Sequence, residues 1–455
     1  MDKIISPRET ALKILYDIEQ NDAYANIALK KYLKNTDYKV VDRGLITELV
    51  YGIIKYKLTI DYIVKQFSSV KINKISPWIL NVLRIGIYQI IYLDKIPDAA
   101  ACNESVKMAK RYGHYASVKY VNAVLRSVSK NKETIKYPDK KKQPADYLEV
   151  AYSYPKWLIQ DWIKRFGFEF TESLCKANNQ IPELCVRVNT LKTTRGALIE
   201  ILGQEGVVAK TGKYCDEALI LEQVGKIDAL KAFKNGLFQV QDESSMMVSK
   251  ILDPQPQELV IDVCCAPGGK TTHIAQLMEN EGKILGWDIH DHKIQLVEAA
   301  CERLSITIAD IQSRDAAVEI EELKNKADRV LVDAPCSGLG IIRRKPDIKW
   351  NKADSDLKEI TSLQKRILNT SAKYVNNGGF LVYSTCTIQD EENIEIVKDF
   401  LESHPDFQLQ DIKGHLPAGL EKETASKGYI QLYPNIDGTD GFFICKLKRQ
   451  VTAQP

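Results

Sequence analysis

The sequence lacks the cysteine spacing of a metal site or of a disulfide framework. Its 455 residues contain 10 cysteines, and no two of them form a Cys-x-x-Cys pair. Zinc sites and disulfide-rich secreted domains both depend on close, regular cysteine spacing. We therefore expect no metal and no disulfide, and a reducing compartment in which single cysteines stay available for catalysis.

Long apolar runs are also missing. No run of about 18 apolar residues is present, which argues against a membrane span. The first 20 residues carry Arg8, Glu9, Asp17 and Glu19 instead of a basic start followed by an apolar core, so they do not read as a signal peptide. We expect a cytoplasmic monomer with no membrane partner.

Net charge is small, +3 for the whole chain, but its distribution is uneven. Residues 1–145 contain 26 Lys and Arg against 14 Asp and Glu, a net charge of +12, and the remainder carries −9. A basic segment joined to an acidic one indicates that the first meets a polyanion such as nucleic acid. A well-solvated helical surface is the alternative explanation.

Helical patterns occupy residues 1–136, where we expect an all-helical domain. Ser6-Pro7-Arg8-Glu9 is a capping box with proline at the first helical position, and apolar residues follow at helical spacing. A proline- and lysine-rich linker is expected at 137–145. Residues 146–241 mix strand and helix patterns and predict a small α+β segment.

Residues 242–450 predict an α/β domain with a Rossmann-like, doubly wound parallel sheet, because short β-rich runs alternate with helical runs. Asn376-Asn377-Gly378-Gly379 is expected to end the helix before the fifth strand. Residues 442–447 are expected to add an edge strand. The five parallel strands are predicted at 259–263, 283–287, 306–309, 329–332 and 380–383.

The first of these strands runs into a loop that lacks a glycine. Residues 260–272 read Val-Ile-Asp-Val-Cys-Cys-Ala-Pro-Gly-Gly-Lys-Thr-Thr, but a phosphate loop needs glycine where Cys264 stands. Pro267 also removes an amide donor that would hold phosphate. The loop therefore predicts a tight strand-to-helix turn for a ligand other than a triphosphate. An ordinary turn with no ligand is the alternative.

Acids and cysteines follow the later strands. Asp288, Asp315 and Asp333 come at or after successive strand ends, where a nucleoside is typically bound. One such acid alone would most often cap a helix. Cys336 and Cys386 follow the fourth and fifth strands, where a thiolate can act as a nucleophile. We interpret six other cysteines as small core residues: Cys102, Cys175, Cys185, Cys215, Cys301 and Cys445.

These motifs together resemble the RNA cytosine-5 methyltransferases of the Nol1/Nop2/Sun type. The resemblance rests on residues 262–271, on Asp-Ala-Pro-Cys-Ser-Gly at 333–338 and on Ser-Thr-Cys-Thr at 384–387, with support from 241–245 and 343–350. Near the N-terminus, Asn-Glu-Ser-Val at 103–106 and Tyr-Val-Asn-Ala-Val-Leu-Arg at 120–126 resemble the NusB-type RNA-binding domain. The pairing is similar to that of bacterial small-subunit rRNA methyltransferases.

The resemblance implies methylation of C5 of a cytosine in 16S rRNA, free or in an assembling small subunit, with S-adenosylmethionine as cofactor. It implies that Cys386 attacks C6 and that Cys336 assists product release. Asp333 is expected near N3 and N4 of the flipped cytosine, and Lys270 is expected to steer substrate or favour the thiolate. The small α+β segment is expected to bind RNA as well.

Two further groups of residues follow from the resemblance. The implied cofactor-binding residues are Cys264, Cys265, Ala266, Pro267, Gly268, Gly269, Lys270, Asp288, Asp315 and Asp333. The expected RNA contacts, through phosphates and one stacked base, are Arg343, Arg344, Lys345, Lys349 and Trp350. A basic loop pinned by one tryptophan is the alternative for the second group.

The chain departs from the family pattern at Cys265, where the family usually has alanine. This change adds a third thiol near the predicted site. Two other function classes remain possible at this point: a nonenzymatic RNA-binding factor of the antitermination kind, and a P-loop NTPase. The first leaves Cys336 and Cys386 unexplained, and the second is disfavoured by Cys264.

Overall fold

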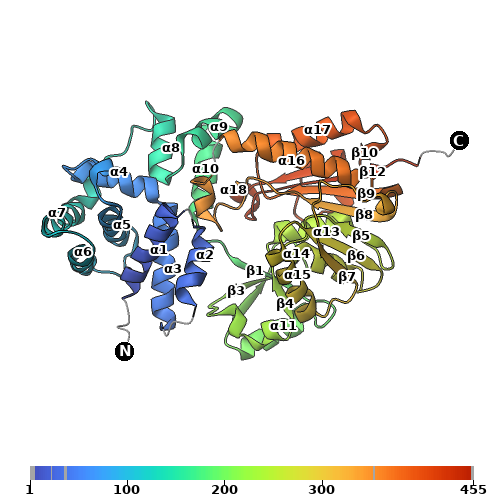
Figure 1. Cartoon of the computed structure of the whole chain (residues 1–455), viewed down its shortest axis with the longest axis horizontal. Coiled ribbons are helices and arrows are strands. Elements are labelled where there is room, and N and C mark those ends of the chain that lie inside the picture. The colour runs from blue at the N-terminus through green and yellow to red at the C-terminus, as the bar shows by residue number, and fades with distance from the viewer. Residues whose placement is uncertain (1–5, 22, 35–37, 352–353, 452–455) are drawn as a thin grey trace. The chain divides into compact units, whose positions relative to one another are not determined.

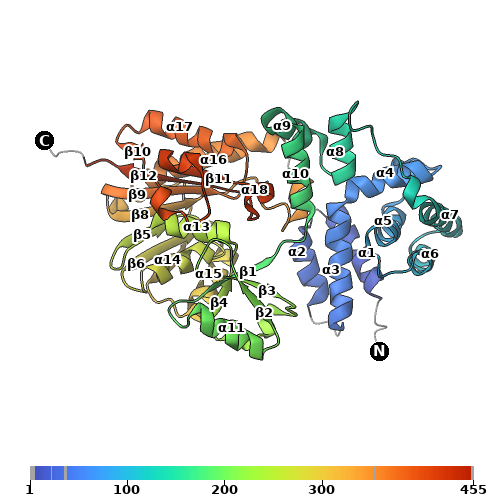
Figure 2. The same cartoon turned by 180° about the vertical axis from the view of Figure 1, so that it is seen from behind.

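The chain divides into two compact units, which the computed structural model describes over residues 6–21, 23–34, 38–351 and 354–451. The first unit comprises residues 1–180 together with 345–351, and the second comprises 181–344 and 352–455. Figures 1 and 2 show their elements from opposite sides. No helix in the described residues is long and apolar enough to cross a membrane.

In its described residues the first unit contains helices and loops but no strand. Its central helix α5 packs against α1, α3, α4, α6 and α7, as the apolar run at 78–91 requires. The elements are α1 Pro7–Gln20, α2 Ala25–Leu33, α3 Val40–Lys55, α4 Lys57–Phe67, η1 Ile72–Lys74, α5 Pro77–Tyr92, α6 Asp98–Tyr112, α7 Tyr115–Asn131, η2 Lys132–Thr134, α8 Pro144–Tyr152, α9 Lys156–Phe166, α10 Phe168–Asn179 and η5 Pro346–Lys349.

The start of α1 follows the predicted cap in part. The Ser6 hydroxyl accepts a hydrogen bond from the Glu9 backbone N–H at 3.2 Å, and Pro7 takes the first helical position. The Glu9 carboxylate does not complete the box. It accepts hydrogen bonds from Arg111 and Tyr112 instead, and so ties α1 to α6.

The unit boundary differs from the expected one. Helix α8 begins at Pro144, inside the predicted linker, and α8 to α10 belong to the helical unit rather than to the following α+β segment. The reason is packing: the Thr59 hydroxyl of α4 donates to the Val150 carbonyl at 2.6 Å, and α8 contacts α4. Glycine at 167 divides the next helical stretch into α9 and α10.

The second unit contains two sheets. The smaller one is antiparallel, with strand order β2-β3-β1-β4. Its elements are β1 Leu184–Val188, α11 Arg195–Gln204, β2 Val208–Thr211, β3 Ala218–Glu222, η3 Ile227–Ala229, α12 Lys231–Lys234 and β4 Phe238–Val240.

The larger sheet has eight strands in the order β10-β12-β9-β8-β5-β6-β7, with β11 paired to β12. Strands β5 to β9 are parallel, and β12 is antiparallel to each of its partners β9, β10 and β11. The elements are α13 Glu243–Leu252, β5 Leu259–Asp262, α14 Gly269–Leu277, β6 Lys283–Asp288, α15 Asp291–Leu304, β7 Ala309–Ser313, η4 Glu321–Leu323, β8 Ala327–Asp333, α16 Asp354–Ala372, β9 Val375–Thr385, η6 Asp390–Glu392, α17 Ile394–Ser403, β10 Phe407–Leu409, η7 Lys413–His415, η8 Glu423–Lys427, β11 Tyr429–Leu432, α18 Pro434–Asp437 and β12 Phe442–Arg449.

Helices cover both faces of this sheet. Val260 and Leu331 point into a core with α13, α14 and α15, whereas Ile261 and Val330 point into a core with α16 and α17. Figure 1 shows these helix groups on opposite faces. The chain order reverses between β5 and β8, which are neighbours, and in a doubly wound sheet this switch point is where ligands bind.

Three local predictions about the large sheet were wrong. Residues 376–379 do not cap a helix but lie inside β9, where Gly378 has a φ of +82°. The third strand begins at Ala309 rather than at 306. Strand β12 is not an edge strand, because it pairs with β9, β10 and β11.

Candidate active site

The turn after β5 has a backbone that a ligand can approach closely. The Ala266–Pro267 peptide bond is cis, Gly268 has a φ of +96°, and α14 begins at Gly269. A Cβ on Gly268 would lie 3.2 Å from Val297 of α15 and would also require a left-handed backbone. The turn therefore brings bare backbone to the carboxyl end of β5 and the N-terminus of α14.

Arg187 of β1 holds the first turn of α14 through hydrogen bonds. This fully buried guanidinium donates to the Gly269 carbonyl at 2.7 Å, to Thr272 Oγ1 at 2.9 Å and to Gln276 Oε1 at 2.5 Å, and it also binds Gln241. Burial lowers the pKa of Arg187 to about 9. The small sheet thus holds the loop of the large sheet in place.

The three strand-end acids lie at the same edge of the large sheet but differ in their partners. Asp288 accepts from the His290 N–H at 3.0 Å, and Asp315 accepts from the Ala317 N–H at 2.9 Å, so each begins a turn. Asp333 instead accepts from Lys270 Nζ at 2.7 Å and from the Ser384 hydroxyl at 2.9 Å. Asp333 is therefore held by neighbours on α14 and β9.

A fourth acid, Asp262, was not predicted. It ends β5 and is fully buried, with one oxygen accepting from the Thr271 hydroxyl at 2.7 Å. Its other oxygen has no hydrogen-bond partner among the described residues, and burial raises its pKa to about 7. An acceptor left unpaired at a strand end beside a glycine turn fits a ligand that brings a cationic or N–H group.

The two predicted thiols meet at the ends of β8 and β9. Cys336 Sγ lies 3.3 Å from Cys386 Sγ, and both side chains are partly accessible. Backbone hydrogen bonds hold the two loops: Ala334 N–H donates to Ser384 O at 2.9 Å, and Gly340 N–H donates to Cys386 O at 3.0 Å. A Cβ on Gly340 would lie only 2.0 Å from the Gly441 carbonyl oxygen, so the close approach of these two backbones requires glycine at 340.

A buried carboxylate supports the Cys336 loop from behind. Glu392 accepts from the Ser337 N–H at 2.8 Å, from the Ser337 hydroxyl and from Gln364 Nε2 at 3.1 Å. The hydrogen bond to Cys386, burial and the negative charge of Glu392 raise the pKa of Cys336 well above its usual range. Cys336 thus keeps its proton at neutral pH in this arrangement.

The turn after β5 contains two further thiols. Cys264 is half-buried and Cys265 is buried against Gly286 of β6. Burial raises the pKa of both thiols, and nearby carboxylates add to the effect. Cys265 therefore behaves as a small core residue, as alanine would at this position.

Comparison with known proteins decides the family. Residues 249–448 match the family described as 16S rRNA methyltransferase RsmB/F, residues 154–228 match a RsmF/B-like ferredoxin-like domain, and residues 5–130 match the NusB family. The probable ribosomal RNA small subunit methyltransferase B of Bacillus subtilis is 41% identical over 98% of this chain and 100% of its own. The Synechocystis protein of the same name is 36% identical over 98% and 100%. The chain belongs to the RsmB/F methyltransferase family.

Solved structures agree with this assignment. One of them aligns with 99% of this chain at a TM-score of 0.79 and 28% identity. The crystal structure of NSun6 from Pyrococcus horikoshii with SFG covers 66% of this chain and 100% of its own, at a TM-score of 0.59 and 25% identity. A methyltransferase of this family uses S-adenosylmethionine, of which SFG is an analogue. Membership in an enzyme family sets aside the antitermination-factor and NTPase alternatives.

The five residues predicted to contact RNA belong to different units and have different partners. Arg343 and Arg344, in the second unit, are paired with Asp440 and Asp242, so these guanidinium groups are already neutralised. The other three belong to the first unit. Lys345 is exposed.

Lys349 does not fit the predicted role of a phosphate clamp. Its ammonium is fully buried, donates to the Lys55 carbonyl at 2.7 Å and lies 4.1 Å from the Tyr154 ring centre. Burial lowers its pKa well below the usual range. Trp350 is half-buried and donates from Nε1 to the Ile54 carbonyl at 2.7 Å. The alternative explanation, a basic loop pinned by its tryptophan, describes Lys349 better.

Proposed function

We propose that this methyltransferase modifies C5 of a cytosine in small-subunit rRNA. The observation that carries the proposal is the pair of thiols, 3.3 Å apart, at the strand ends next to the glycine turn and the Lys270–Asp333 pair. C5 of cytosine is a weak nucleophile, so its methylation needs an activating group, whereas a site that methylates a stronger nucleophile would not need a thiol. A thiolate that adds to C6 makes C5 nucleophilic.

Cys386 is the proposed nucleophile. Its Sγ bonds to C6, the C5–C6 double bond opens, and C5 takes the methyl group that S-adenosylmethionine supplies. A base then removes the C5 proton, and the electron pair of that C–H bond re-forms the double bond as the C6–S bond breaks. Cys336, which keeps its proton beside Glu392, is placed to protonate the departing Cys386 thiolate.

Asp333 and Lys270 hold the base and cofactor ends of this site in the proposal. The charge-assisted bond between them fixes both side chains, and one Asp333 oxygen is aligned by Ser384. The residues proposed to hold the cofactor are the backbone of 264–269 with Asp288 and Asp315. A reducing, cytoplasmic compartment suits the proposal, because two adjacent thiols must both stay reduced.

The test is transfer of labelled methyl groups to unmodified small-subunit rRNA, free and in assembling particles, followed by digestion to nucleosides. We expect label in 5-methylcytidine with the wild-type chain and none with Cys386→Ala. Cys102→Ala, which removes a buried thiol of the helical unit, is the matched control and should transfer normally. Label in any other nucleoside, or full activity of Cys386→Ala, contradicts the proposal.

A further inference from the structure

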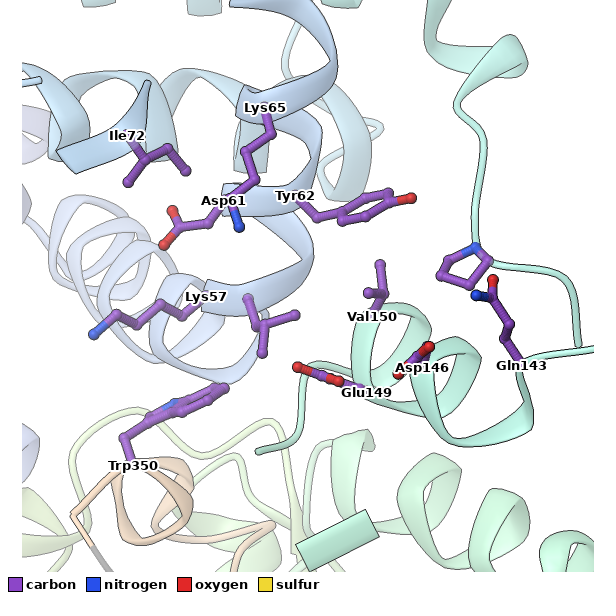
Figure 3. A pocket seen from close by; sticks show the side chains of 12 residues that line it. Lys57, Asp61, Tyr62, Lys65, Ile72, Gln143, Asp146, Glu149, Val150 and Trp350 are labelled. Carbon is purple, nitrogen blue, oxygen red and sulfur yellow. The ribbon is translucent and has the colours of Figure 1, made fainter. Parts of the chain in front are cut away.

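A cavity lies entirely in the helical unit. It has a volume of about 580 Å³ and is lined by α4, by α8, by the turn between residues 138 and 143 and by Trp350. Figure 3 shows side chains from α4 and α8 reaching into it from facing walls, with Trp350 on a third side. None of the residues discussed for methyl transfer lines this cavity.

Most charges in this cavity are already compensated. Arg84 binds both oxygens of Asp61 at 2.7 Å, and Lys57 pairs with Glu19 at 3.1 Å. The Asp146 carboxylate accepts from Lys156 at 2.7 Å. The apparent excess of carboxylates in the lining therefore does not make the cavity a cation site.

Glu149 is the exception. Its carboxylate is half-buried, and among the described residues its neighbours act on it through charge rather than through a side-chain hydrogen bond. Burial raises its pKa, and the positive charges of Lys156 and Lys65 offset this effect only in part. A half-buried carboxylate has two oxygens that are best satisfied by two parallel N–H donors.

Trp350 supplies an aromatic surface in the same cavity. Its indole is held by the hydrogen bond to the Ile54 carbonyl, so the ring has a fixed orientation. Leu58, Ile72 and Val150 add apolar side chains to a lining that also contains charged groups. A planar aromatic ligand gains from stacking on such a surface, at about 1–3 kcal/mol per nucleobase in RNA-binding proteins.

The rim of the cavity is basic. Lys65 lines it and is exposed, and Lys141 and Lys142 lie in the turn that joins the lining residues Pro138 and Gln143. The whole segment 1–145 carries a net charge of +12. An anionic chain that places one aromatic group in the cavity would meet these lysines with its phosphates.

We propose that this cavity binds one unpaired guanine of single-stranded RNA, stacked near Trp350 and read by Glu149. Among the four RNA bases, only guanine presents a ring N–H next to an exocyclic NH₂ on one edge, and this pair of donors matches a carboxylate. Adenine and cytosine place an acceptor beside their amine, and uracil places acceptors on both sides of its N–H. The proposal rests on the RNA substrate of the proposed function and adds a contact outside the reaction site.

The test measures binding of the full-length chain to four labelled RNA pentanucleotides. Each has uridine at its four outer positions, and the central base is guanine, adenine, cytosine or uracil. We expect the guanine oligonucleotide to bind roughly 10-fold or more tightly than the adenine one, as a bidentate base contact provides. In Glu149→Gln the preference should fall to near one, because an amide offers one acceptor and one donor. Glu133→Gln, which removes an exposed carboxylate of the same unit, should keep the preference.

Equal binding of all four oligonucleotides by the wild type, or a guanine preference that survives Glu149→Gln, overturns the proposal. Cys386→Ala should lose methyl transfer but keep the guanine preference, so it separates the proposed reaction from the proposed guanine site. A guanine preference without any methyl transfer by the wild type contradicts the proposed chemistry but leaves this cavity as the guanine site. Methyl transfer without a guanine preference supports the proposed chemistry and contradicts the guanine site.

Discussion

At the residue scale, a carboxylate behind Cys336 adds to the effects of the Cys386 hydrogen bond and of burial in raising the pKa of that thiol. Replacing Glu392 by glutamine removes a nearby negative charge, so the pKa of Cys336 should fall. The measurement is the pH dependence of Cys336 alkylation in a Cys386→Ala background, quantified by peptide mass spectrometry. Glu395→Gln, on the exposed side of α17, is the control. An unchanged or higher pKa in Glu392→Gln would refute the role given to this carboxylate.

The positions of the thiols and acids of the proposed site could be predicted from the sequence because each stands beside a recognisable strand end. Strand periodicity and the parallel arrangement place such residues at one sheet edge. Glu392 and Arg187 could not be predicted in this way. Their partners lie far away along the chain, 55 residues from Glu392 to Ser337 and 89 from Arg187 to Gln276, so no local pattern reports them.

At the element scale, β1 of the small sheet positions α14 of the large one. Arg187→Met keeps the volume but leaves four acceptors on and near α14 without their donor. We expect the free energy of unfolding to fall by about 2–4 kcal/mol and S-adenosylmethionine binding to weaken, because the glycine turn loses its support. Urea denaturation and calorimetric titration measure the two effects.

Arg187→Lys and Lys210→Met complete this experiment. Lysine keeps the positive charge with fewer donors, so Arg187→Lys should recover part of both losses. Lys210 lies on the exposed strand β2, and its substitution should change neither quantity. Unaltered cofactor affinity in Arg187→Met would show that the network is only structural.

Helix α14 also makes a pH-sensitive contact with Glu217, which directly precedes β3 of the small sheet. His273 of α14 is buried 3.1 Å from Glu217, and burial together with the Arg187 charge lowers its pKa to about 4. Because the unfolded chain takes up a proton near pH 6.5, this residue's contribution is present above 6.5 and is lost as pH falls towards 4. Burial opposes ionisation of Glu217, but the contact with His273 brings its pKa down to about 2.

We therefore expect the free energy of unfolding to decrease by up to about 3 kcal/mol between pH 7 and pH 4 through His273. His273→Gln should flatten this part of the curve, since glutamine keeps a donor for Glu217 but does not titrate there. Urea midpoints at several pH values compare the two chains. Parallel curves for wild type and variant would contradict the assignment.

Element boundaries were predicted less well than element types. The Asn-Asn-Gly-Gly stretch has the composition of a helix end, yet pairing with β8 and β12 draws it into a long strand. Helices α8 to α10 follow a linker-like segment, but their apolar faces pack on the helical unit. In both cases tertiary contacts that the local sequence does not encode decide the outcome.

At the scale of the whole molecule, net charge is unevenly distributed: residues 1–145 carry +12 and the remainder carries −9. RNA affinity should therefore fall steeply with salt, linearly in a plot of log K against log salt concentration. Substituting Lys141 and Lys142 by glutamine should reduce the magnitude of the slope by about one to two. Binding titrations between 50 and 200 mM salt test this, and a slope near zero would exclude phosphate contacts.

The measurement that tests the central claim most directly is the covalent adduct between this chain and its rRNA substrate. Wild type, Cys336→Ala and Cys386→Ala are each incubated with S-adenosylmethionine and unmodified small-subunit rRNA, then separated on a denaturing gel. The account predicts that Cys336→Ala accumulates a protein–RNA adduct and that Cys386→Ala forms none. An adduct in Cys386→Ala, or its absence in Cys336→Ala while methyl transfer continues, would contradict the roles proposed for the two thiols.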